Sequence, residues 1–205
     1  MRKFLPAVVL AAILASACAP APQRLGESER KALRSVAVDA NVTKPPEPFY
    51  LGPGGGFGLS FGALGAAATE GVRAQERATL VEFVERNGVS IERIVLEEFT
   101  GALRGSGKLR LAESAGDATI RIVIRQYGLS IPNGFSSNLV PILFVVCEMK
   151  DPAGRVLWSA SDRISTLGNP VEGRPADEIR NDARAIEAAW RAAARHVSAN
   201  ILKDL

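Results

Sequence analysis

Ser60 and His196 are the residues whose types and order most directly suggest chemistry. The stretch GLSFG, residues 58–62, matches the G-x-S-x-G turn on which α/β-hydrolases present a nucleophilic serine, and the single histidine follows it in the required order. That turn depends on a parallel core strand directly before it, whereas the preceding residues are LGPGGGF, and His196 falls within a predicted helix. A hydrolase that uses Ser60 and His196 is therefore the third of our hypotheses for function.

The sequence gives less support for a phosphate-binding loop or a metal site. The glycines at 52, 54, 55, 56, 58, 62 and 65 fit no G-x-G-x-x-G frame, and no Lys-Ser or Lys-Thr pair follows them. The chain has one histidine, and Cys147 lies in the apolar run ILFVVCEM, where we expect it to be buried. Only carboxylates are therefore left as metal ligands. Glu97 and Glu98 are adjacent on a predicted helix, so we expect them to diverge and face solvent. The sequence predicts no metal, no cofactor and no acid–base pair, hence a protein that is not an enzyme.

The glycine-rich segment 52–71 has a spacing that suits packing. Small residues recur there every fourth position, at Gly54, Gly58, Gly62 and Ala66, which is the small-xxx-small pattern that lets another backbone approach closely. Phe57 and Phe61 add apolar surface. Because each glycine costs a helix about 1 kcal/mol relative to alanine, a free-standing helix is disfavoured. We predict a contact segment, ordered against another subunit, the lipid surface or its own domain.

The amino terminus predicts export and a lipid anchor. Arg2 and Lys3 precede an apolar run that ends near Leu14, which is the layout of a signal peptide over residues 1–17 and is shorter than the roughly 20 residues of a spanning helix. Cys18 follows in LASAC, which resembles the lipobox of bacterial lipoproteins. That resemblance implies a covalent lipid on Cys18, and Ala19 after it implies the outer membrane.

The composition predicts one domain behind a short linker. Residues 18–32 are rich in proline and alanine at their start and read as the lipidated cysteine with a flexible tether. Residues 33–205 then fit a single domain. The 25 basic and 22 acidic residues are interspersed, so no basic block suggests nucleic acid.

Periodicity predicts an α+β domain in the order strand, helix pair, four strands, helix. Alternation indicates strands over 34–42, 108–112, 117–131, 139–151 and 155–165, with the fourth apolar on both faces and the turn DPAG before the fifth. Helical spacing indicates helices over 73–88 and 91–105, with Ser90 as the N-cap of the second, and one long helix from Pro175. We expect a mostly antiparallel sheet of about five strands with helices packed on one face.

Several of these stretches resemble a known group. SVAVDANV, the helix IERIVLEEFTGALRGSG, GDATIRIVIRQYG and the hairpin CEMKDPAGRVLW resemble the small lipoproteins related to the curli-secretion lipoprotein and the amino-terminal domain of TolB. The order Asp117-Ala118 reverses the group's usual pair, while Gly154, Leu157 and Trp158 keep its hairpin pattern. The resemblance implies a periplasm-facing domain that assembles into rings or envelope complexes, and it carries no catalytic residue.

These observations lead to one leading hypothesis and one main alternative. The leading hypothesis is an outer-membrane lipoprotein, facing the periplasm, that acts as a non-catalytic scaffold or assembly component of an envelope or secretion complex. Its partners would be the membrane, through the lipid on Cys18, and either further copies of itself or other envelope proteins. The alternative is a lipid- or small-ligand-binding lipoprotein of the lipopolysaccharide-assembly kind.

Overall fold

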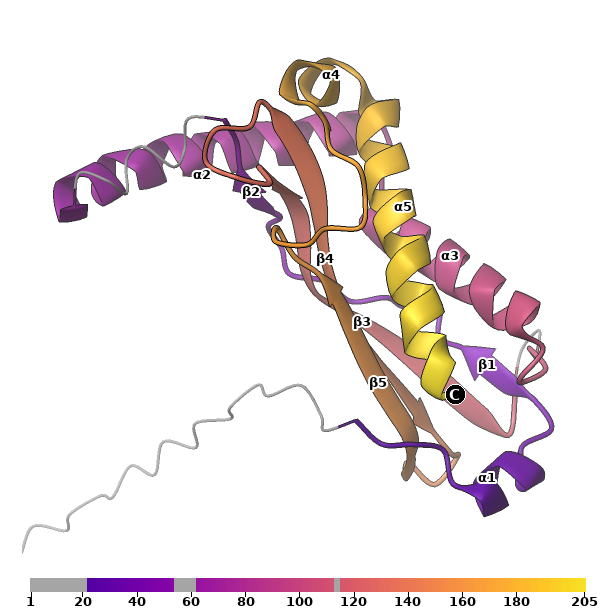
Figure 1. Ribbon diagram of the computed structural model, residues 1–205. Helices are drawn as coiled ribbons and strands as arrows, with labels where there is room; N and C mark the ends of the chain where they lie inside the picture. Colours follow the sequence, from indigo (N-terminus) through magenta and orange to yellow (C-terminus); the bar gives the residue numbers. More distant parts are fainter. Residues whose placement is uncertain (1–21, 54–61, 113–114) are drawn as a thin grey trace, which may run out of the picture.

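A long, strongly twisted sheet forms the centre of the computed structural model, which describes residues 22–53, 62–112 and 115–205 (Figure 1). Within these residues the strands form one six-stranded sheet. Its strands are β1 (Val36–Val38), β2 (Phe49–Leu51), β3 (Ala118–Ser130), β4 (Asn138–Lys150), β5 (Val156–Ile164) and β6 (Arg174–Pro175). The main order is β1-β3-β4-β5, with β2 beside β3 and β6 beside β4. The pairs β3–β4 and β4–β5 are antiparallel, whereas β1 and β2 run parallel to β3.

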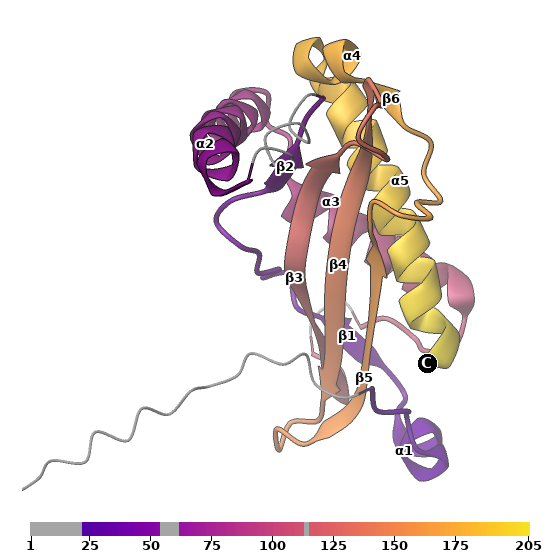
Figure 2. The ribbon, with the colours of Figure 1, turned by 60° about the vertical axis from the view of Figure 1, so that its left-hand side comes forward.

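The helices lie mainly on one side of this sheet. They are α1 (Glu27–Ala32), α2 (Gly62–Arg86), α3 (Ile91–Ser106), α4 (Ala176–Asn181) and α5 (Ala183–Ile201), and a 3-10 turn over Leu202–Asp204 ends the chain. In Figure 1 α3 and α5 lie side by side along the sheet, and in Figure 2 α3 lies behind β3 and β4. The predicted α+β class, with a mostly antiparallel sheet, is confirmed.

Strand β4 is central, as its continuous apolar run predicts. It pairs with β3 on one side and β5 on the other, and both of its faces carry buried residues, among them Val145, Val146 and Cys147. In β3 the alternating Ile120, Ile122 and Ile124 are at most 2% exposed and face the helices. A bulge between Ile124 and Gln126 then shifts the alternation by one residue, so that Tyr127 and Leu129 face the helices instead.

Helix α3 follows its sequence pattern closely. Its buried residues are Ile91, Ile94, Val95, Phe99 and Leu103, which is the apolar stripe that the spacing predicts. The Ser90 side chain accepts a hydrogen bond from the Arg93 N–H at 3.2 Å, so this N-cap is confirmed. The helix ends one residue later than predicted, because Gly107 adopts the left-handed conformation that suits a C-terminal cap.

The carboxy-terminal helix begins near Pro175 as predicted, but it is broken. Asp182 has an extended backbone between α4 and α5, and its side chain accepts a hydrogen bond from the Arg184 N–H at 2.9 Å. An aspartate that caps a new helix in this way competes with continuation of the preceding one. Beyond the break, Ile186, Trp190 and Val197 are buried on the sheet side of α5.

Local structure departs from the predictions at four further places. Strand β2 was not predicted, and residues 108–112 contribute only the bridge between Leu111 and Val36. Helix α2 begins at Gly62 rather than near residue 73, since the alanines at 63 and 66–68 are strong helix formers that offset the glycines. The last part of the expected tether is structured: Gln23 exchanges two backbone hydrogen bonds of 2.9 Å with Ser159 on β5, and Leu25 is 6% exposed.

Candidate functional site

The projecting half of α2 is the part of the predicted contact segment that the structure describes. Gly62 and Ala66 lie in its first two turns, whereas Gly54, Phe57, Gly58 and Phe61 lie outside the described residues. Figure 1 shows the first half of α2 extending past the edge of the sheet. From residue 71 onward, where side chains are described, the buried residues of α2 are Leu80 and Val84, both in its second half. The described contacts of α2 with the core thus lie in its second half.

A cavity lies between α2 and the neighbouring residues of β2, α4 and α5. Its volume is about 320 Å³ and its walls are mainly apolar: Val72, Leu80, Phe83, Ile179 and Ile186, with Gln75, Glu76 and Thr79 at α2. Tyr50 and Arg180 complete the lining. Burial raises the pKa of Tyr50, and a hydrogen bond from Arg180 offsets part of that shift, so the phenol stays neutral at physiological pH. An apolar chamber edged by a phenol, a guanidinium and the Glu76 carboxylate suits an amphiphilic molecule with a polar head.

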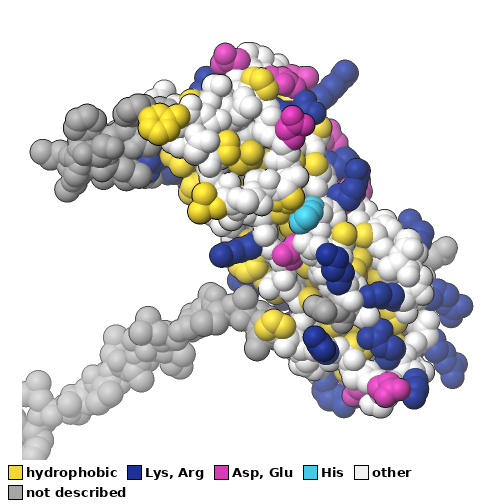
Figure 3. All heavy atoms as spheres, in the orientation of Figure 1, with side chains coloured by type: hydrophobic (Ala, Val, Ile, Leu, Met, Phe, Trp, Pro, Cys, Tyr) yellow, Lys and Arg dark blue, Asp and Glu magenta, His cyan; other side chains and the backbone are white. Residues whose placement is uncertain are grey.

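Large exposed hydrophobic side chains occur in the same half of the molecule. Phe49 on β2 is 40% exposed, Val72 on α2 is 58% exposed, Leu167 after β5 is 83% exposed and Phe135 between β3 and β4 is 92% exposed. The elements that carry them lie in the upper half of Figures 1 and 2, and Figure 3 shows hydrophobic side chains gathered beside α2. Scattered single residues of this kind need no explanation, but a group at one end marks a candidate interaction surface.

Glu97 is exposed as predicted, whereas Glu98 is largely buried, and the two carboxylates converge on one arginine instead of diverging. Arg191 of α5 reaches both carboxylates, at 3.0 and 3.1 Å, and also Glu187 at 2.9 Å. Arg195 pairs with Glu98 at 3.1 Å. Burial alone would raise the pKa of Glu98, but the bonds from Arg195 and Arg191 outweigh it and hold that pKa below its ordinary value. These charges join α3 to α5, and the pattern was hidden because the partners are over 90 residues apart.

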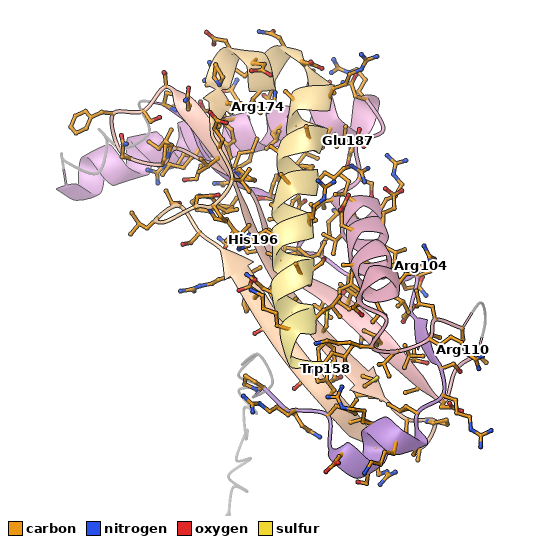
Figure 4. All side chains as sticks on the ribbon, turned by 45° about the vertical axis from the view of Figure 1, so that its right-hand side comes forward. Arg104, Arg110, Trp158, Arg174, Glu187 and His196 are labelled. Carbon is orange, nitrogen blue, oxygen red and sulfur yellow. The ribbon has the colours of Figure 1, made fainter. Side chains whose placement is uncertain are left out.

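Ser60 lies outside the described residues. His196 is exposed midway along α5 (Figure 4), where Asn200 Nδ2 donates to its Nε2 at 3.0 Å and also to Asp162 Oδ2 at 2.9 Å. Cys147 is fully buried on β4, and burial raises the pKa of its thiol, which confirms a packing role.

Across residues 22–53, 62–112 and 115–205, no three histidine, cysteine or acidic side chains gather closely enough to hold a metal ion. In the same ranges, none of the helices combines the length and the apolar character that crossing a bilayer requires.

Comparison with known proteins gives structural likeness without sequence relatives. No family model matches the chain, and no curated protein matches it either. A DUF330 protein of Xanthomonas campestris is 18% identical, with 54% of this chain and 58% of that chain covered and a TM-score of 0.40. This chain thus spans less than two thirds of that protein's length.

Two other similar structures cover more of the chain. The PelC dodecamer of Paraburkholderia phytofirmans is 13% identical, covering 84% of this chain and 87% of that chain with a TM-score of 0.35. Lipoprotein GNA1162 of Neisseria meningitidis is 17% identical, covering 76% and 94% with a TM-score of 0.28. The similar structures thus include a named bacterial lipoprotein, while the resemblance to the curli-secretion and TolB group stays a prediction.

Proposed function

We propose that this chain is a lipoprotein, anchored in the outer membrane through Cys18 and facing the periplasm, that acts as a non-catalytic assembly component of an envelope complex. Its polar clusters support this proposal, because the described carboxylates that lie together are used in packing. Glu97, Glu98 and Glu187 bind Arg191 between α3 and α5. These carboxylates are thereby engaged in ion pairs within the domain.

The projecting half of α2 carries the proposal. Isolated helices shorter than about 12–15 residues are marginal in water, and glycines weaken them further. The amino-terminal part of α2, which begins GALGAAATEG, extends past the edge of the sheet, away from the buried Leu80 and Val84 (Figure 1). A second chain packed against these small residues would supply the missing support, because small side chains let two helix backbones approach closely. We infer that the occupant is a further copy of this chain or another envelope protein.

Valine substitutions at two small residues of the contact segment, Gly58 and Gly62, test this assembly. We expect the double variant Gly58→Val/Gly62→Val to shift the detergent-extracted lipidated protein from its assembled size to monomer, with unchanged far-UV circular dichroism. Gly101→Val is the matched control, since Gly101 is exposed on α3 and a side chain there meets nothing within 4 Å. Multi-angle light scattering measures the size. An assembled size that is the same in both variants would refute the proposal.

The anchor has its own test, in the number of free thiols. With a lipid on Cys18, the denatured protein presents one reactive thiol, Cys147, and the intact mass exceeds that of the polypeptide by a diacylglycerol and an acyl chain. Two thiols and an unmodified mass would contradict the anchor. This measurement does not depend on how the domain assembles.

The cavity under α2 favours one second function, the binding of a lipid or small ligand. Its volume of about 320 Å³ is near the lower end of the range for ligand pockets, and Arg180 with Tyr50 would bind a polar head over apolar walls. Native mass spectrometry of the purified protein would detect a co-purified amphiphile. Arg180→Gln should release it, whereas Arg184→Gln, an exposed change outside the cavity lining, should not. A protein that carries no ligand in either form would remove this candidate.

A further inference from the structure

We propose that the sheet face opposite α3 and α5 is a docking surface for anionic phospholipid headgroups, with Arg121, Arg125 and Arg163 as its contacts. The inference deepens the proposed function and rests on the lipid anchor at Cys18. It assigns the domain an orientation on the membrane, with its sheet against the bilayer and its helices toward the periplasm.

Strand alternation places the three arginines on this face. The buried Ile120, Ile122 and Ile124 point toward the helices, so the exposed Arg121 and Arg125 between and after them point the other way. The bulge at residue 125 keeps Gln126 on the same open face, opposite Phe144. Phe144 in turn lies opposite Arg163 of β5. Figure 2 shows β3 and β4 with α3 behind them, on the far side from this face.

The charge on this face is positive and available. Arg121, Arg125 and Arg163 are exposed, and within the described residues their side chains have no ion pair. The acidic residue that β3, β4 and β5 contribute to this face is Glu148, whose carboxylate is already paired with Lys150 at 2.7 Å. Guanidinium groups bind phosphate in a bidentate manner, so free arginines suit phospholipid headgroups.

A hollow lies beside Arg125 at the sheet face that carries the three arginines. It has a volume of about 640 Å³ and is lined by Arg125, Gln126, Phe144 and Phe49 together with Arg77 and a proline loop. Phe49 is 40% exposed there. Glu47 at its rim pairs with Arg77 at 3.6 Å, which leaves the Arg125 charge uncompensated. A cationic hollow with aromatic walls matches a headgroup and the first carbons of its chains.

The position of the anchor selects this face over the helix side. Cys18 is five positions before Gln23, whose backbone is hydrogen-bonded to Ser159 on β5, so the proposed lipid attachment point can lie at most about 18 Å from that strand. Arg121, Glu148 and Ser159 share one row of the sheet, which puts Arg121 about 10 Å from Ser159, and Arg163 lies about 13 Å along β5. The helix layer adds at least one helix diameter, about 10 Å, to the path on the other side.

Vesicle binding tests the proposal without the anchor. The probe is the mature chain from residue 18 with Cys18→Ser, sedimented with vesicles of phosphatidylcholine that contain 30% phosphatidylglycerol. Each arginine near an anionic surface contributes about fivefold in affinity at low salt, so the triple change Arg121→Gln/Arg125→Gln/Arg163→Gln should weaken binding about 100-fold. Binding should also fall with added salt and vanish on pure phosphatidylcholine.

Basic side chains on the helix side provide the control, since Figure 3 shows several over the lower half of that face. Arg104 of α3 (Figure 4), Arg184 of α5 and Lys203 after it are exposed, and the triple change Arg104→Gln/Arg184→Gln/Lys203→Gln removes the same charge. Weakening by the sheet-face triple alone supports the proposal. Equal weakening by both triples, no vesicle binding, or binding to a soluble polyanion but not to vesicles overturns it. Because the thiol count reports on the anchor separately, failure here and failure of the anchor are distinguishable.

Discussion

The two tryptophans of the core provide a matched pair that isolates one hydrogen bond. Trp158 of β5 and Trp190 of α5 are 0% and 1% exposed, so each Trp→Phe change removes the same buried bulk. They differ in their indole nitrogens. Trp190 Nε1 donates to the Gly128 carbonyl at 3.2 Å, whereas Trp158 Nε1 is buried without a partner among the described residues.

The structure sets the direction and size of the difference. Trp190→Phe loses a net bond of about 1 kcal/mol and leaves the Gly128 carbonyl without that donor, which adds about 1 kcal/mol or more. Trp158→Phe removes a donor whose burial without a partner costs about 1–3 kcal/mol. We therefore expect Trp190→Phe to be at least 2 kcal/mol less stable than Trp158→Phe.

Urea unfolding of the two variants, followed by far-UV circular dichroism, measures the difference. The comparison requires equal m-values, because only then does the shift in midpoint report the free energy of unfolding. Tyr127 packs edge-on against Trp190, with ring centroids 5.8 Å apart, and a phenylalanine keeps that contact available. Equal stability of the two variants, or a less stable Trp158→Phe, would refute the hydrogen-bond reasoning.

Three further predictions use other parts of the structure. Gly128→Ala should cost about 3 kcal/mol in thermal unfolding, because a Cβ there would overlap the Phe49 backbone, while Gly101→Ala should stabilise α3 by about 0.5–1 kcal/mol. Glu98→Gln should lower the free energy of unfolding by about 1 kcal/mol at pH 7. Because the pKa of Glu98 is lowered in the folded protein, its contribution to stability is present above the unfolded pKa of about 4.3. The difference in stability between the variant and wild type should therefore disappear as the pH falls below that value. The Cys147 thiol should react with a thiol reagent only after denaturation, because burial raises its pKa and excludes the reagent, and rapid labelling of the native protein would contradict this.

Local signals in the sequence determined much of the fold. The stripe from Ile91 to Leu103, the Ser90 cap and the double-sided apolar run of β4 all depend on residues within one or two turns or strands, so their structure follows from nearest neighbours. The Asp151–Gly154 turn likewise positions β5 beside β4. The predicted lipid anchor also depends only on local pattern, in the residues that lead to Cys18.

Contacts between residues far apart in the sequence decided the remaining features of the fold. The local sequence around each residue does not indicate its distant partner. The parallel placement of β1 and β2 beside β3 exists only once the chain has passed through two helices, and the bond of Gln23 to Ser159 spans 136 residues. Arg191 gathers three carboxylates only when α5 lies on α3. The arginine face exists for the same reason: alternation puts Arg121 and Arg163 on one side of their strands, but only the packing of α3 and α5 decides that this side faces away from the helices.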